Sequence, residues 1–125
     1  MNVPANLKYT SDHEWIRVEG DIATIGVTDY AQGELGDVVF VELPDVGDEF
    51  AKGDVAATIE AVKTVADVIL PVSGSIEAVN EALDDASELI NQDAYGQGWI
   101  IKVKISDVSE LNDYMSAEDY TASIS

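Results

Sequence analysis

Cysteine is absent from this chain of 125 residues, and basic residues are scarce. The lack of thiols excludes disulfides, thiolate zinc sites and cysteine nucleophiles. Six Lys and Arg stand against 25 Asp and Glu, which gives a formal net charge of −19. This charge repels phosphate backbones, so we expect no nucleic-acid partner. Two explanations of the acidity stay open, the steering of basic protein partners and a host that lives at high salt.

Long apolar runs are missing as well. No run reaches the roughly 18 residues that a membrane span needs. The start, MNVPANLKYT, lacks the basic-then-apolar order of a secretory signal. We therefore expect a cytoplasmic protein with no membrane partner. Because 46% of the residues are hydrophobic, the chain has enough apolar side chains for one core, and we expect a single domain over 1–125 and a monomer.

Histidine occurs once, at His13. A Ser/His/Asp triad would have to be built around this residue, and no GxSxG nucleophile motif is present. We therefore expect His13 to pack or to form a local hydrogen bond. The bound metals that histidine and cysteine clusters would hold are not expected either.

Most local patterns indicate β-structure. WIRVEGDIATIGV is typical of a hairpin that turns at 19–21, and TDYAQGEL predicts a short helix capped by Thr28. DVVFVELP predicts a strand that ends before Pro44. GWIIKVKIS predicts a strand whose apolar side chains at 99, 101, 103 and 105 point one way.

The C-terminal segment, about 106–123, is predicted to form one or two short helices. Ser106, Ser109 and Ser116 are the candidate N-caps, because each precedes a short amphipathic stretch.

A short internal repeat brackets one lysine. VELPDVG at 41–47 and VILPVSG at 68–74 share the pattern VxLPxxG, which predicts two copies of a strand, a proline that ends it and a glycine that turns the chain. Between the copies, TIEAVKTVAD indicates a hairpin over about 54–70 with Lys63 at its tip.

The chemistry of Lys63 favours a tether over a nucleophile. A Schiff-base lysine needs a pKa depressed by burial or by a nearby cation, and the neighbouring Glu60 and Asp67 would instead stabilise the ammonium. A lysine on a rigid turn is well placed to carry a group on a long arm, which raises the effective concentration of that group at a partner's active site.

Several segments together resemble the H protein family of the glycine cleavage system. They are SDHEW, GVTDYAQGELGDVVFVELPDVGD, EAVKTVADV, PVSGSIEAVNEAL and YGQGWIIKVK. The resemblance runs over nearly the whole chain and implies a mainly β fold, a flattened barrel-sandwich hybrid of two small antiparallel sheets with a few short helices, as in lipoyl and biotinyl carriers. One departure is the turn, EAVKT where ESVKA is usual; another is Glu34, where some members carry a histidine.

The resemblance implies a carrier that catalyses no step. Lys63 would hold lipoic acid in amide linkage. Its partners would be a lipoylating enzyme, a glycine decarboxylase (P protein) that loads an aminomethyl group, an aminomethyltransferase (T protein) that passes the one-carbon unit to tetrahydrofolate, and a dihydrolipoyl dehydrogenase (L protein) that reoxidises the arm.

The same resemblance assigns roles to five further residues. Glu60 and Gly74, three before and eleven after the lysine, would present the turn to the lipoylating enzyme. Glu14 and Asp67, with Asp12 as a weaker third, would line a groove that holds the cationic loaded arm by charge-assisted hydrogen bonds.

Two other classes stay open from the residues. One is a different carrier, a biotin domain or the lipoyl domain of a 2-oxo acid dehydrogenase, although the turn here reads VKT rather than the methionine-flanked or DKA sequences usual there. The other is a binding protein that keeps the fold without modification.

Overall fold

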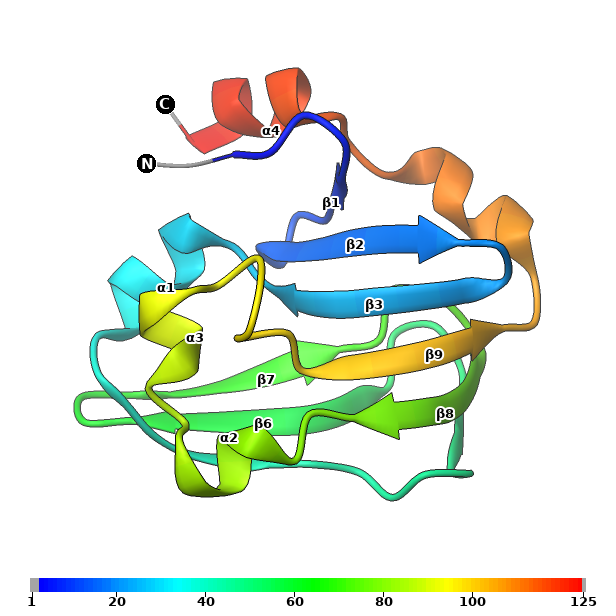
Figure 1. The fold of residues 1–125 in the computed structure, drawn as a ribbon. Coiled ribbons are helices and arrows are strands. Elements are labelled where there is room, and N and C mark those ends of the chain that lie inside the picture. The colour runs from blue at the N-terminus through cyan, green and yellow to red at the C-terminus, as the bar shows by residue number, and fades with distance from the viewer. Residues whose placement is uncertain (1–2, 125) are drawn as a thin grey trace.

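Two antiparallel β-sheets form the body of the molecule. The computed structural model describes residues 3–124, with the two sheets stacked and short helices at their ends (Figure 1). The larger sheet has the strand order β1 (Lys8–Tyr9), β2 (Glu14–Glu19), β3 (Ile22–Val27), β9 (Ile101–Ile105), β8 (Gly74–Val79) and β5 (Glu49–Phe50). The smaller sheet has the order β4 (Val38–Glu42), β6 (Val55–Ala61) and β7 (Val65–Ile69). This is the two-sheet, mainly β arrangement that the sequence predicts.

The helices are short and lie at the margins of the sheets. They are α1 (Asp29–Leu35), α2 (Ala82–Asp85), α3 (Leu89–Gln92), the 3₁₀ helix η1 (Val108–Asp113) and α4 (Ala117–Ile124). The first three gather at one end of the molecule, whereas α4 lies beside β1 (Figure 1). None of the helices in the described part of the chain is long and apolar enough to cross a membrane.

The main core lies between the sheets. Ile25, Ile59 and Leu70 are fully buried there, and from β9 the alternation brings in Ile101 and Val103. The prediction that Trp99 points the same way as Ile101 and Val103 in this strand is wrong. Trp99 precedes β9, packs with a second cluster around Trp15 and Tyr9, and lies 5.2 Å from the Nζ of Lys102.

Capping predictions were partly right. The Thr28 hydroxyl accepts a hydrogen bond from the Ala31 amide at the start of α1, as expected. In the C-terminal segment the Ser116 hydroxyl accepts from the Asp119 amide, which confirms that cap. The predicted caps at Ser106 and Ser109 were wrong. The cap of η1 is the side chain of Asp107, which accepts a hydrogen bond from the amide of Ser109. The Ser106 hydroxyl instead donates to the Ser73 carbonyl.

The two VxLPxxG copies share their strand and proline but differ at the glycine. Gly47 has φ of 95° and turns the chain, as predicted. Gly74 does not turn it, because it is the first residue of β8 and pairs with Phe50 of β5 and Ile105 of β9. A Cβ on Gly74 would overlap the carbonyl oxygen of Lys104 and would lie 2.8 Å from Val103 Cγ1. The glycine is therefore needed for the close approach of two backbones.

Gly74→Ala should lower the free energy of unfolding by about 3 kcal/mol, because the added methyl group forces β8 and β9 apart. The matched control is Gly33→Ala in α1, where a Cβ meets no atom within 4 Å. That change should raise the free energy of unfolding by ~1 kcal/mol, because alanine is the better helix former. Urea unfolding of both variants tests the pair, and equal stability of the two would contradict the close-approach argument.

Candidate functional site

Lys63 lies at the tip of the β6–β7 hairpin, which projects at one end of the smaller sheet (Figure 1). Val62 and Lys63 form the loop, which is closed by a hydrogen bond of 2.8 Å from the Ala61 amide to the Thr64 carbonyl. Both loop residues are exposed and neither has a positive φ. The predicted hairpin and its exposed lysine are thus confirmed, with no glycine needed at the reversal.

A second contact anchors this turn to the segment after α1. The Val62 amide donates to the Asp37 carbonyl at 2.9 Å. The Lys63 stem packs on Gly36, where an added Cβ would lie 3.1 Å from the lysine Cε. The backbone of the turn is therefore held from two sides, while the side chain of Lys63 stays exposed.

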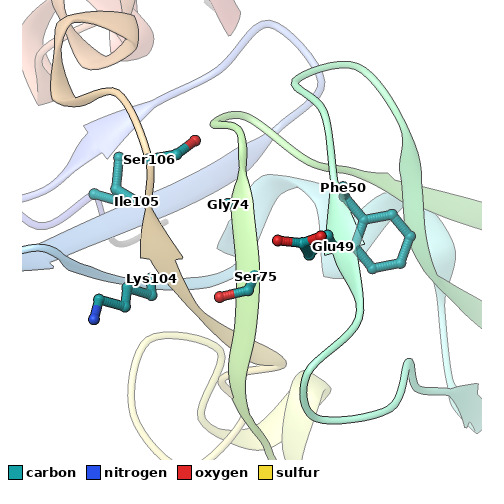
Figure 2. Close-up of a pocket in the computed structure, with 7 residues that line it drawn as sticks. All are labelled: Glu49, Phe50, Gly74, Ser75, Lys104, Ile105 and Ser106. Carbon is teal, nitrogen blue, oxygen red and sulfur yellow. The ribbon is translucent and has the colours of Figure 1, made fainter.

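The two residues assigned to lipoylation recognition lie far apart. Glu60 is exposed on β6 beside the turn, where it pairs with Val65 and Phe40. Gly74 lies at the start of β8, at the opposite end of the molecule from the turn (Figure 1). A shallow cavity of about 270 Å³ surrounds Gly74, between β5 and β9 (Figure 2). The structure brings Glu60, but not Gly74, to the lysine.

A cavity of about 380 Å³ adjoins the lysine turn, and we name it the turn cavity. Its walls come from β7, from α1 and from the loop before β2. It is lined by Asp12, His13, Tyr30, Ala31, Glu34, Leu35, Thr64, Val65 and Ala66. The mixture of apolar and acidic side chains suits an apolar arm that ends in a cation.

His13 shapes one wall of the turn cavity through contacts that the sequence did not predict. Its backbone has φ of 64°, and its Nδ1 lies 2.8 Å from the hydroxyl of Tyr120 in α4. The same hydroxyl lies 2.7 Å from Thr28 Oγ1. The imidazole also packs on Tyr30. His13 therefore packs as expected, but its hydrogen bond is long-range, because α4 folds back onto the start of α1.

Glu14 lies in a second cavity of about 250 Å³, which we name the Glu14 cavity. It is lined by Thr10, Ser11, Asp12, Glu14, Lys52, Gly53, Ile69, Leu70, Pro71 and Tyr114. Its carboxyl group is buried, with only 2% of the residue exposed. Oε2 accepts a hydrogen bond of 2.7 Å from the Ile69 amide, whereas Oε1 has no hydrogen-bond partner among the residues that the structure describes. Asp12 lines both cavities and so stands between them.

Burial raises the pKa of Glu14 to about 8. The Ile69 amide works against this rise, and the negative charge of Asp12 adds to it. Near neutral pH the carboxyl group is therefore largely protonated. A cation brought to Oε1 would favour the ionised form, so the group is suited to binding an amine.

Asp67 is exposed and lines neither cavity. The register pairs it with Thr58 of β6, which in turn pairs with Glu42 of β4. These three side chains share the outer face of the smaller sheet, because directly paired residues project on the same side. The structure thus brings Asp12 and Glu14 together but leaves Asp67 on the outer face of the hairpin.

Comparisons with known proteins agree over nearly the whole chain. The family model for the glycine cleavage H-protein matches residues 7–125. The chain belongs to this family. The H protein of Halothermothrix orenii is 58% identical over 96% of this chain and 94% of its own length. That of Bacteroides thetaiotaomicron is 56% identical over 98% of this chain and 97% of its own.

A solved structure supports the same assignment. The crystal structure of a glycine cleavage system H protein from Mycobacterium marinum matches with a TM-score of 0.89 at 37% identity, over 98% of each chain. H proteins are lipoyl carriers without a catalytic step of their own. The family assignment decides against the biotin domain and the 2-oxo acid dehydrogenase lipoyl domain.

The raised pKa of Glu14 predicts a pH-dependent stability. The folded state holds a proton on Glu14 that the unfolded state releases near pH 4.5, so the free energy of unfolding falls as pH rises from about 5 to 8. Glu14→Gln should remove this slope and be more stable than the wild type by several kcal/mol at the upper end. Urea unfolding across this range measures it. The control Glu77→Gln, at an exposed position of β8, should follow the wild-type slope, and parallel curves for Glu14→Gln would contradict the prediction.

Proposed function

We propose that Lys63 carries the lipoyl group of this H protein and that the two cavities beside the turn receive the arm. The observation that carries the proposal is an exposed lysine on a turn whose backbone is held from two sides, next to the turn cavity of about 380 Å³. A fixed base and a free side chain are what a swinging arm requires, since the arm must leave one site and enter another.

The protein is a carrier in the glycine cleavage system, where it serves the P, T and L proteins in turn. When bound, the dithiolane would supply two sulfur atoms, of which one would take up the aminomethyl cargo and both would be reoxidised to the disulfide at the end of the cycle. The chain's own residues do the rest: they fix the base of the arm, give its apolar part a surface and shield its charged end from water.

The turn cavity and the Glu14 cavity fit the two ends of a loaded arm. Ala31, Leu35 and Ala66 offer apolar contacts near Lys63. Beyond them, Asp12 and the unpartnered Oε1 of Glu14 offer acceptors to an ammonium group. The approach of the cation would lower the pKa of Glu14, so that the carboxyl group would release its proton to solvent and form a buried charge pair with the ammonium group. Asp67, on the outer face, would contribute longer-range attraction only.

Recognition by the lipoylating enzyme is assigned to Glu60, which is exposed three residues before Lys63. For Gly74 we propose an indirect part, because it holds β8 against β9 at the far end of the molecule. We place the protein in the cytoplasm, together with the other components of the glycine cleavage system.

Lys63→Arg should abolish modification while keeping the charge, because a guanidinium is not acylated by the lipoylating enzyme. Intact mass after incubation with that enzyme should show no lipoyl addition, and the exchange of glycine carboxyl with carbon dioxide should be lost. Lys104→Arg, at an exposed position of β9 that lines neither of the two cavities, is the matched control and should behave as the wild type. A lipoyl group on the Lys63→Arg variant would place the attachment elsewhere.

Glu14→Gln should shorten the lifetime of the loaded carrier by roughly tenfold, because a charge-assisted hydrogen bond to the ammonium is replaced by a neutral one. Asp67→Asn should change it by about twofold or less, since an exposed charge is screened. The readout is ammonia released after the decarboxylase is removed. Lipoylation, followed by mass, should stay normal in both variants. An unchanged lifetime in Glu14→Gln would remove Glu14 from the groove.

A further inference from the structure

The outer face of the smaller sheet carries an apolar row at the end next to the lysine. Cross-strand pairing sets Phe40 of β4, Glu60 of β6 and Val65 of β7 side by side. Phe40 is 48% exposed and Val65 is 59% exposed. Val62, in the turn itself, is 74% exposed. We name these four residues the turn face.

The next row along the same face is polar. It consists of Glu42, Thr58 and Asp67, in the same cross-strand order. The exposed apolar side chains of this sheet are thus mostly at the end that bears Lys63, and Val55, at the far end of β6, stands apart from them. Exposed valines and a phenylalanine gathered beside a modification site, in a chain of net charge −19, indicate an interaction surface.

The atom on which each partner acts indicates which partner must contact the turn face. The P, T and L proteins act on sulfur atoms at the far end of the lipoyl arm, so their active sites do not have to reach the sheet. An enzyme that acylates Lys63 must reach the Nζ atom itself, which lies at the end of a side chain packed on Gly36. In that step the ammonium gives up two protons, a C–N bond forms to an activated lipoyl acyl carbon, and the bond from that carbon to its leaving group breaks. Residues beside the turn must then touch the enzyme.

We propose that the turn face is the docking surface for the lipoylating enzyme. The enzyme would meet it with an apolar patch that seats Phe40 and Val65 and with a basic side chain opposite Glu60. The charge of Glu60, flanked by apolar neighbours on both strands, is positioned to be desolvated on docking and so to select a cationic partner. The inference rests on Lys63 as the attachment site and extends recognition from Glu60 to three apolar residues.

The test uses the unmodified full chain, the lipoylating enzyme and an activated lipoyl donor. Phe40→Thr combined with Val65→Thr keeps residues that favour strands but removes the apolar contacts. Its KM for lipoylation should rise about tenfold, which corresponds to ~1.4 kcal/mol of binding free energy, with kcat little changed. The matched control is Val46→Thr combined with Val108→Thr, two exposed valines outside the turn face, which should leave KM unchanged.

A second readout separates docking from the reactivity of the amine. A small acylating reagent, the succinimidyl ester of lipoic acid, should modify Lys63 equally in both double variants, as followed by peptide mass. If the double variant at Phe40 and Val65 does not fold, Glu60→Gln against Glu42→Gln tests the same surface. Only the first should raise the KM and weaken its dependence on salt.

Several outcomes would overturn the inference. One is a KM for lipoylation that stays normal in the turn-face variants. Another is a KM that rises equally in the double variant at Phe40 and Val65 and in its control at Val46 and Val108. Because Val65 also lines the turn cavity, the arm is tested with Phe40→Thr alone, and normal lipoylation with impaired glycine exchange in that variant would assign the turn face to the decarboxylase instead. A wild-type chain that the enzyme modifies at a residue other than Lys63 would refute the proposed function itself, which is distinguishable from a docking failure on Lys63.

Discussion

The hydrogen bond from the Ile69 amide to Glu14 Oε2 joins the two sheets beside the Glu14 cavity. β7 is an edge strand of the smaller sheet, and Glu14 opens β2 of the larger one. A buried carboxyl group satisfies one donor on the open edge, which also protects that edge from pairing with another chain. Its second oxygen stays unpartnered among the described residues, and Glu14 is one of the residues that line a cavity. The same group thus links the sheets and keeps an acceptor free.

At the lysine turn the backbone is held in place, whereas the side chain of Lys63 is exposed. The backbone is held by the Ala61–Thr64 bond and by the bond from Val62 to Asp37. The stem of Lys63 lies on Gly36, and the residue remains exposed. Because the segment after α1 is part of this support, the position of the Lys63 side chain depends on α1. The α1 helix in turn depends on Thr28, which Tyr120 of the C-terminal α4 contacts. The C-terminal helix therefore contributes to the support of the lysine turn.

The effect of each acidic residue depends on where it lies in the structure. The overall charge favours encounters with basic surfaces, whichever partner presents them. Glu60 lies among apolar neighbours, where one charge can specify a contact. Glu14 is buried and largely protonated near neutral pH, so it contributes little to steering and can bind a cation that displaces its proton. The location of each carboxyl group, rather than the total, decides what it does.

The sequence by itself determined the local elements and the lysine. Alternation, capping at Thr28 and the absence of breakers around Lys63 act over a few residues, so hairpins, α1 and the exposed turn were predictable. Only the tertiary structure decided which acids meet. Glu14 and Asp67 looked equivalent in sequence, yet sheet packing buries one and the register leaves the other outside. Gly74 read as a turn glycine, and only the approach of β9 showed why it lacks a side chain. Contacts between distant strands depend on how whole sheets stack, and no local pattern encodes that.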